Sequence, residues 1–412
     1  AGWAEVGVLA CLALLAAGLP FAAITTSREI GLLGGLMFWA ARMVLSGKWD
    51  LVRTPLDLPL ALFLATGLLS LVTAIDLGYS LHELRGEMFK GILIYYLVVN
   101  NLRTEARAKV VLLALAAGVV VMDVYGAIHF FSSGGGLVSA GVREAGLHRG
   151  NQELATYLAQ TGPYLVLGFF WLKGRRNLAI LGALLALHFL VAHVTFSRMA
   201  MVVLVVEVGL ILFLAGLSWK IALGGLVGAI LVMAMVMPRP IIVLGDKQYE
   251  GLARVGGIGV LGLEGSRLEM WKTAANHLRH HPFTGLGFGR RSYTKGFPEM
   301  KGLHHNYWHA HNTFLNLAVE LGLQGLAAFC FILYRIFKNL WPGRGPDAVW
   351  RRAKTAGLII TGAWVMAAGY FIRNLTDDIY NNDAALLFWL LVGCAFSMKQ
   401  FVLDSPAGKA EG

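Results

Sequence analysis

The chain has 412 residues, of which 57% are hydrophobic and only 14% are charged. Because soluble proteins carry about 25% charged residues, this composition excludes an ordinary soluble enzyme and predicts an integral membrane protein. The net charge of +11 does not indicate nucleic acid binding, because the basic residues are scattered among apolar segments. The three cysteines lie in apolar stretches and provide neither a disulfide framework nor a metal-binding spacing. We therefore expect membrane lipids and an anionic ligand as partners.

The predicted fold is all-α, a polytopic membrane protein with about twelve spanning helices. The first apolar segment lacks the basic start and the cleavage site of a signal peptide, so we expect a true span there. Nine spans fall in 1–237, a loop subdomain outside the membrane fills 238–310, and three spans follow in 311–412. The expected spans are 5–24, 30–47, 58–75, 87–101, 108–131, 153–172, 178–196, 198–217, 219–237, 311–337, 355–372 and 384–401.

Lys and Arg are concentrated in the loops that would share one side of the membrane with both termini. Since such loops usually face the cytoplasm, this predicts cytoplasmic termini and an outward-facing long loop. The basic residues of the short outer loops are all arginines, whose planar guanidinium suits phosphate oxygens. Anchoring at the membrane interface is the alternative explanation. These residues are Arg28, Arg85, Arg143, Arg149, Arg198 and Arg373.

Two Ser–Arg pairs are predicted to begin helices. Ser197 and Arg198 begin the eighth span, and Ser266 and Arg267 begin a helix of the long loop in which Glu269 completes a capping box. A cation at a helix N-terminus opposes the helix dipole by roughly 0.3–1 kcal/mol, unless an anion binds there. Arg198 and Arg267 are therefore candidate ligands of two phosphates. The alternative is that each reaches the membrane surface or pairs with a nearby acid.

The stretch from Trp308 to Gly325 reads as the end of a polar loop followed directly by an apolar helix. At 3.6 residues per turn, His311, Ala318, Gly322 and Gly325 would share one face of that helix. Such a face of small residues would let another helix pack closely, with an imidazole at its outer end. A neutral imidazole can act as a general base near pH 7, whereas a packing or capping role is the alternative.

The motif H-N-x9-G-x-x-G closely resembles the signature of the O-antigen ligase/O-antigen polymerase superfamily of membrane glycosyltransferases. Further family motifs follow in the same order, and the resemblance covers residues 197–325. GLHRGNQELATYL, which contains Arg149, resembles another family stretch more weakly. The residues that carry the main resemblance are Ser197 and Arg198, Arg267 with Trp271, the stretch HPFTGLG at 281–287, His311 with Asn312, Gly322 and Gly325.

The resemblance implies that a glycan is transferred, with inversion, from undecaprenyl diphosphate to an acceptor hydroxyl. The reaction would take place on the periplasmic side of a bacterial inner membrane and would need no cofactor. His311 would be the general base, and Arg198 and Arg267 would stabilise the leaving diphosphate.

The acceptor distinguishes three relatives that share this chemistry: O-antigen ligase, O-antigen polymerase and protein O-oligosaccharyltransferase. We favour the ligase, whose acceptor is the lipid A–core oligosaccharide, because the outer face is basic and no large polar segment follows the last expected span. A solute transporter is the alternative of another class, but no internal repeat is evident and the polar motifs gather at one membrane face.

Further substrate contacts are expected from polar and aromatic residues of the outer loops. Asp377 and its neighbour Asp378 would bind sugars, orient His311 or belong to a solvated loop. The histidines of the long loop are too irregularly spaced to predict a zinc site, so we expect no metal. Asp123 and Glu207 lie inside spans and are expected to have structural partners across helices. The expected substrate contacts are Asn312, Arg143, Arg149, Trp271, Tyr307, Arg373 and Asp377.

Overall fold

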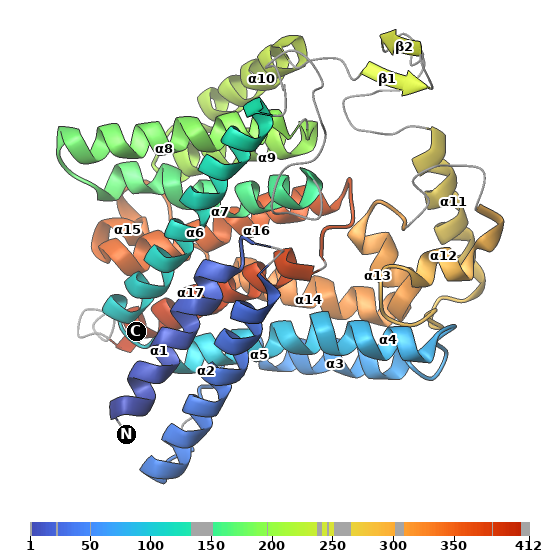
Figure 1. Ribbon diagram of the computed structural model, residues 1–412, viewed down its shortest axis with the longest axis horizontal. Helices are drawn as coiled ribbons and strands as arrows, with labels where there is room; N and C mark the ends of the chain where they lie inside the picture. The colour runs from blue at the N-terminus through green and yellow to red at the C-terminus, as the bar shows by residue number, and fades with distance from the viewer. Residues whose placement is uncertain are drawn as a thin grey trace.

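The computed structural model describes residues 2–21, 24–49, 51–132, 151–195, 197–236, 241–244, 247–250, 265–300, 309–380 and 382–404. Within these ranges the chain is helical, as predicted, apart from one antiparallel ribbon (Figure 1). The ribbon pairs β1 (Ile241–Leu244) with β2 (Lys247–Glu250) in the long loop, where the all-α prediction included no strand. The β-branched run at 241–243 explains it, because such residues favour strand pairing.

The described residues between 2 and 236 form ten α-helices, and a π-helical turn at Leu84–Phe89 joins two of them. They are α1 (Gly2–Gly18), α2 (Thr25–Ser46), α3 (Asp57–Ser70), α4 (Leu77–Glu83), α5 (Lys90–Asn101), α6 (Glu105–Ser132), α7 (Asn151–Trp171), α8 (Arg175–Val194), α9 (Arg198–Leu214) and α10 (Trp219–Val236).

The second half begins with two helices of the long loop and ends with two long apolar helices. The elements are α11 (Gly265–His280), α12 (Ser292–Gly296), α13 (Thr313–Leu321), α14 (Leu323–Asn339), α15 (Val349–Arg352), α16 (Lys354–Asn374) and α17 (Asn382–Asp404), with short 3-10 turns at Pro298–Met300 and Gly345–Asp347.

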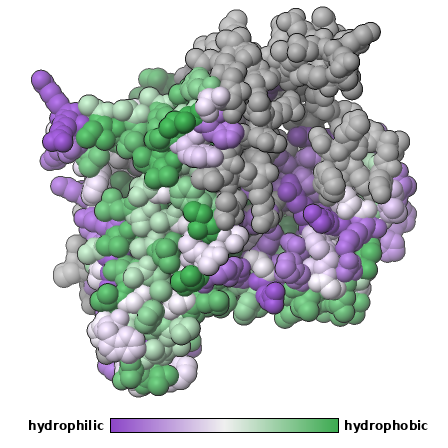
Figure 2. Space-filling model, in the orientation of Figure 1, coloured by the Kyte–Doolittle hydropathy of each residue, from purple (hydrophilic) through white to green (hydrophobic). Residues whose placement is uncertain are grey.

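Five helices of the described chain, α2, α6, α8, α16 and α17, are long and apolar enough to cross a membrane. Only 22% of the apolar window of α2 and 28% of that of α8 are buried, so apolar side chains such as Met37 of α2 and Ile180 of α8 cover the outer surface. Figure 2 shows this surface as a broad hydrophobic area. Because water disfavours so large an apolar surface, the protein is a multi-pass membrane protein. The number of about twelve spans stays a prediction.

The core lies around α16 and α17, each of which has 72% of its apolar window buried. Trp389 of α17 packs edge-on against Tyr95 of α5, with ring centroids 6.0 Å apart. Gly91 permits this approach, because a Cβ atom at that position would lie 2.4 Å from the Trp389 ring. Close contact through a small residue is the usual way in which membrane helices pack.

Asp123 and Glu207 were both expected to have partners across helices, and in the described chain only Asp123 has the expected one. Asp123 Oδ2 of α6 lies 2.8 Å from His188 Nδ1 of α8, so this acid has the expected partner across helices. Glu207 of α9 is also buried and packs directly against Gly369 of α16. Among the residues that the structure describes, its carboxylate has no hydrogen-bond partner.

The predicted helix 311–337 is not continuous, and its single face of small residues is wrong. α13 ends at Leu321, and Gly322 takes φ 77° and ψ 174° before α14 begins. The carbonyls of Val319 and Glu320 accept hydrogen bonds from Leu286 and Gly287 of the preceding loop, at 3.0 and 3.1 Å. The helix therefore stops because the loop binds its last carbonyl groups.

Candidate active site

The site lies where α13 begins, beside the loop that joins α16 to α17. His311 lies two residues before α13, next to the N-cap residue Asn312, and has a positive φ of 48°. Asn312 caps the helix, because its Oδ1 accepts a 3.1 Å hydrogen bond from the Leu315 N–H. The Asn312 amide also donates to the Leu375 carbonyl at 3.0 Å. The predicted loop-to-helix boundary is thus correct, and Asn312 attaches it to the α16–α17 loop.

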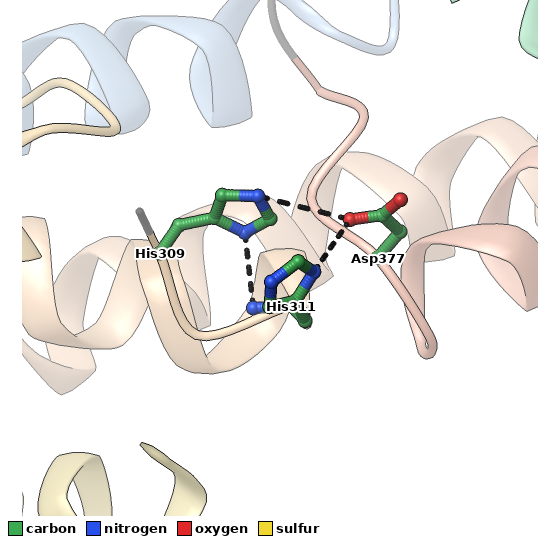
Figure 3. Close-up of side chains that lie close together, drawn as sticks. All are labelled: His309, His311 and Asp377. Atoms are coloured by element: carbon green, nitrogen blue, oxygen red, sulfur yellow. Dashed lines mark hydrogen bonds and ion pairs between the residues drawn. The ribbon is translucent and has the colours of Figure 1, made fainter. Parts of the chain in front are cut away.

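Two histidines and one carboxylate meet at this point (Figure 3). His311 Nδ1 lies 3.1 Å from Asp377 Oδ1, and His309 Nε2 lies 3.8 Å from the same oxygen. The His311 backbone N–H donates to His309 Nδ1 at 3.0 Å, which supports the unusual backbone conformation of His311. A neutral His311 that donates Nδ1–H to Asp377 carries its lone pair on Nε2. This is the arrangement of a carboxylate-oriented general base.

The pKa values of two residues beside His311, Asp377 and His309, are shifted. Burial alone would raise the pKa of Asp377, but the His311 hydrogen bond and the nearby His309, His311 and Arg373 hold that pKa well below its usual range. Burial, reinforced by the charge of Arg290, lowers the pKa of His309 well below its usual value. Asp377 therefore stays ionised and His309 stays neutral at physiological pH.

A buried polar network lies next to this group. Asp378 accepts hydrogen bonds from Thr313 Oγ1 at 2.7 Å and from Asn316 Nδ2 at 3.0 Å. Thr313 also hydrogen-bonds Asn374 at the end of α16. Burial raises the pKa of Asp378, and Arg290 opposes that shift. Of the two adjacent aspartates, Asp377 thus contacts the imidazole, whereas Asp378 fixes the start of α13 to the α16–α17 loop.

A cavity of about 290 Å³ contains the His311–Asp377 pair. Arg267 of α11 is part of its wall and donates a 2.6 Å hydrogen bond to the Thr376 carbonyl. Three of the predicted site residues, His311, Arg267 and Asp377, therefore share one cavity. Its walls are formed by Glu153, Thr156, Arg267, Arg290, His309, His311, Asp377, Asp378, Ile379 and Ala384.

Two predicted arginines lie elsewhere. Arg198 begins α9 after the extended N-cap residue Ser197, and it is not among the described residues that line the cavity. Arg373 is only 1% exposed. It donates to Thr156 Oγ1 and to Ser197 Oγ, both at 3.1 Å, and so joins α16 to α7 and α9. Arg373 thus lies behind the cavity wall and supports Thr156 from inside the protein.

Trp271 supports the site rather than lining the cavity. Its Nε1–H donates to the Ala310 carbonyl at 2.8 Å, directly before His311. α11 begins at Gly265, so Arg267 lies within its first turn and is not its first residue. The other expected contacts, Arg143, Arg149 and Tyr307, lie outside the residues that the structure describes.

Sequence reasoning missed three ionisable residues of the wall: Glu153, Arg290 and His309. His309 lies only two positions before His311, and that spacing was the available signal. Arg290 directly follows the glycine-rich stretch after Pro282, but no pattern predicts that this stretch reaches the cavity. Glu153 lies near the start of α7, within the weaker resemblance.

His309, His311 and Asp377 are also the one group in the described chain that could share a metal ion. Their potential ligand atoms lie within 4.8 Å of one another. Two imidazoles and a carboxylate are a donor set that zinc accepts. Here, however, His311 Nδ1 faces Asp377, and His309 Nδ1 accepts the His311 N–H. A metal would have to replace these contacts, so the expectation of a metal-free site stays a prediction.

Comparison with known proteins identifies the same region. Residues 180–330, which include Arg267 and His311, match the family described as O-antigen ligase. An 80-residue stretch is 34% identical to a protein of Rickettsia typhi described as a "putative polysaccharide ligase", and 32% identical to similarly described proteins of Rickettsia felis and Rickettsia conorii. Each match covers 18% of this chain and 20% of the relative, so the chain aligns with about a fifth of their length. Residues 180–330 of the chain are therefore similar to an O-antigen ligase-type family.

Proposed function

We propose that the protein is a membrane glycosyltransferase that moves a glycan from undecaprenyl diphosphate to the lipid A–core oligosaccharide. The observation that carries this proposal is the 3.1 Å contact between His311 Nδ1 and Asp377, in a cavity that Arg267 also lines. The match to the O-antigen ligase family supports the reaction class. The apolar helices support a donor that is anchored in the membrane.

In the proposed reaction, His311 Nε2 takes the proton of the acceptor hydroxyl while its Nδ1–H donates to Asp377. The acceptor oxygen attacks the anomeric carbon as the bond to the diphosphate oxygen breaks, and the electron pair leaves with the diphosphate. A single displacement of this kind inverts the anomeric configuration. A diphosphate is a good leaving group, so the step needs a base and fixed positive charge but no general acid.

The proposed ligands of the leaving group are Arg267 and Arg198. Arg267 lines the cavity, and its hydrogen bond to Thr376 holds the guanidinium near His311. Arg198 follows Ser197, whose hydroxyl accepts from Arg373. We propose that Arg198 contacts the donor at the α9 end of the site. In the same proposal, Asn312, Trp271 and Arg373 act by holding the wall that surrounds the substrate.

The proposed location is the inner membrane, with both termini in the cytoplasm and the site facing the periplasm. In Figure 1, α1 begins on the left of the bundle, whereas α11 and α12 lie on the right. This separation agrees with the distribution of Lys and Arg in the loops. The segment 238–310 would then form a periplasmic subdomain between the spans of 1–237 and those of 311–412.

The test is an acceptor comparison in proteoliposomes. The purified protein is supplied with a glycan on undecaprenyl diphosphate and with lipid A–core, a second lipid-linked repeat or an acceptor peptide. We expect transfer to lipid A–core, its loss in His311→Ala, and its retention in the control His280→Ala, which changes an exposed histidine at the end of α11.

Other outcomes would change the assignment. Transfer only to a second lipid-linked repeat would make the protein a polymerase, and transfer only to a peptide would make it a protein O-oligosaccharyltransferase. If the folded protein transfers the glycan to none of these acceptors, the proposal is wrong and a solute transporter becomes the better hypothesis.

A further inference from the structure

A second cavity, of about 260 Å³, lies between α2, the π-helical turn and the start of α17, and we call it the α2–α17 cavity. Its described lining residues are all different from those of the cavity around His311. The two cavities are nevertheless neighbours, because Asp383 lines this one and the next residue, Ala384, lines the other. The charged residues of its wall are Arg28, Glu29, Glu83, Glu87, Lys90 and Asp383.

One loop also connects the walls of the two cavities. A Cβ atom at Gly289 would lie 2.8 Å from Glu83 Cγ, so the loop packs directly on Glu83, which lines the α2–α17 cavity. The next loop residue, Arg290, lines the cavity around the candidate base. The Arg291 N–H donates to the Tyr79 hydroxyl of α4 at 3.0 Å and fixes the loop there. The α2–α17 cavity therefore lies beside the candidate active site without being part of it.

The helix that passes through the π-helical turn presents a polar face to the α2–α17 cavity. Glu83, Gly86, Glu87 and Lys90 all line it, and they are spaced as residues of one helix face. Charged residues among membrane helices usually face a water-filled cavity or a substrate path, and single π turns are frequent at functional sites. The polar face therefore indicates a binding cavity rather than a packed contact between helices.

Both permanent cations of this wall are paired with acids. Arg28 of α2 pairs with Asp383 of α17, and the two side chains are 7% and 15% exposed. Lys90 pairs with Glu29, whose side chain is 47% exposed, so the cavity reaches the protein surface at that point. The wall thus carries four carboxyl groups against two permanent cations, and each cation already has an acidic partner.

This distribution of charge disfavours several classes of ligand. A phosphate group would face the four carboxyl groups, and it would compete with them for both cations. An apolar ligand would cover charged groups without offering them hydrogen bonds, which is costly. A metal ion needs converging ligand atoms, and in the described chain only His309, His311 and Asp377 bring three such groups together.

Sugar hydroxyls fit the wall, because each hydroxyl can both donate and accept a hydrogen bond. Glu87 Oε1 accepts the Asn382 N–H at 2.8 Å, and a carboxylate has about four lone-pair positions, so Glu87 can also accept from a ligand. Thr25, Arg28 and Lys90 place hydroxyl and N–H donors in the same wall. Pockets for drug-sized ligands measure about 300–1,000 Å³, so this smaller cavity suits a single sugar unit.

We propose that the α2–α17 cavity binds one sugar unit of a glycan substrate, separate from the sugar that reacts beside His311. This inference rests on the proposed function, because that function supplies the glycans. The bound unit belongs either to the glycan that is transferred or to the acceptor saccharide, since both present the same hydroxyl groups. Binding there holds the glycan at a second point, which orients the reacting end and selects substrates by their sugars.

The test uses one variant that fills the cavity and one that changes its polarity. Gly86 lines the cavity and a Cβ atom there would meet nothing within 4 Å, so Gly86→Phe should place a ring in the cavity. Gly182→Phe in the middle of α8 is its control, because a Cβ atom there also meets nothing within 4 Å. Glu87→Gln keeps an oxygen for the Asn382 N–H but removes the charge, and Glu299→Gln, at an exposed acid, is its control.

Sugar binding is measured without turnover. The full chain in lipid nanodiscs is titrated with two free saccharides, the core oligosaccharide released from lipid A and the glycan repeat released from its carrier, and saturation-transfer NMR gives each affinity. We expect the wild type to bind at least one of them. Gly86→Phe should abolish that binding, and Glu87→Gln should weaken it by about ten- to a hundredfold, as expected for a lost hydrogen bond to a charged group. Both controls should stay within about twofold of the wild type.

The two saccharides distinguish the two sources of the sugar. If Gly86→Phe loses the core oligosaccharide, the cavity belongs to the acceptor, and if it loses the glycan repeat, the cavity belongs to the donor. Wild-type affinity of Gly86→Phe for both saccharides would refute the inference, as would a wild-type protein that binds neither. If Gly86→Phe does not fold, unchanged affinity in Glu87→Gln would equally refute it.

Transfer assays on the same variants separate this inference from the proposed function. We expect the KM of the substrate that carries the bound sugar to rise in Gly86→Phe, whereas a merely structural role would lower kcat and leave both KM values unchanged. A wild-type protein whose saccharide binding depends on Gly86 but which transfers glycan to no acceptor would overturn the proposed function alone. Glycan transfer by Gly86→Phe with wild-type KM values for both substrates would overturn the inference alone.

Discussion

His311 Nδ1 lies 3.1 Å from Asp377 Oδ1, although 66 positions separate the two residues in the chain. One belongs to the loop before α13 and the other to the loop between α16 and α17. The side chains are 13% and 16% exposed, so water competes little for their contact. An ionised carboxylate at Nδ1 fixes the tautomer of the imidazole and stabilises the cation that forms when Nε2 accepts a proton.

The first prediction concerns Asp377→Asn, which removes the charge but keeps the shape of the side chain. We expect kcat to fall by about 10²–10⁴, the usual contribution of a positioned acid–base group, with little change in the KM for the donor. Steady-state transfer assays measure both constants. The control is Asp404→Asn at the exposed end of α17, which should be neutral.

A double variant tests whether Asp377 acts through His311. Asp377→Asn combined with His311→Ala should be no slower than His311→Ala alone, because groups that act as a unit lose their effects together. If the fall in kcat of the double variant equals the product of the two single falls, Asp377 acts independently of the imidazole.

The second prediction concerns the arginines near the leaving group. Arg267→Lys should reduce turnover by about 10²-fold, because a point charge cannot replace the planar fork aimed at the phosphate. Arg198→Lys should have a smaller effect, since Arg198 is not among the described residues of the cavity wall. Donor binding and single-turnover rates measure both, and Arg279→Lys at the exposed end of α11 is the control. Wild-type affinity and turnover in both variants would remove these arginines from the mechanism.

The third prediction concerns the break between α13 and α14. Gly322→Ala should destabilise the protein by about 1–3 kcal/mol, because φ 77° with ψ 174° is a region that essentially only glycine adopts. Thermal unfolding in detergent measures the change. Gly182→Ala in the middle of α8 is the control, since a Cβ atom there meets nothing within 4 Å. An equal unfolding temperature for both variants would contradict the inference that only glycine fits the backbone conformation between α13 and α14.

The fourth prediction concerns pH and His309. Its pKa in the folded protein lies well below the value of about 6.5 that the unfolded chain should have, mainly because the imidazole is buried. The unfolded state therefore binds more protons as the pH falls below about 6.5, and the folded state loses stability. Above that pH the stabilising contribution is fully present.

His309→Asn should remove this titration. We expect the stability of the wild type to fall more steeply between about pH 7 and pH 5 than that of the variant, as measured by unfolding at each pH. His280→Asn, which changes an exposed histidine, should keep the wild-type slope. Parallel curves for the wild type and His309→Asn would contradict the assignment of a buried neutral imidazole.

The fifth prediction concerns metal. The potential ligand atoms of His309, His311 and Asp377 lie close together but already contact one another. We expect transfer to continue in EDTA, because an imidazole base and arginine donors supply what the reaction needs. Transfer assays before and after chelation measure this. Loss of activity in EDTA that zinc alone restores would instead establish a metal site.

The sequence by itself determined the helical class of the protein and the chemical types of the residues in the candidate site. Long apolar segments with little charge indicated the helices, since a single helix satisfies its own backbone hydrogen bonds inside a membrane. The polar-to-apolar change at Asn312 marked the start of α13, and the resemblance singled out His311 and Arg267. Each of these features depends on residues that are close in the chain or on a motif of fixed spacing.

Tertiary structure alone decided which of these residues meet. His311 contacts Asp377 rather than Asp378, which instead contacts Thr313, because of the way in which the α16–α17 loop crosses the start of α13. Tertiary structure also ended α13 at Gly322, where carbonyl groups bind a loop that begins some forty residues earlier in the chain. Contacts between distant segments depend on how helices pack, and the local periodicity of a sequence does not predict that packing.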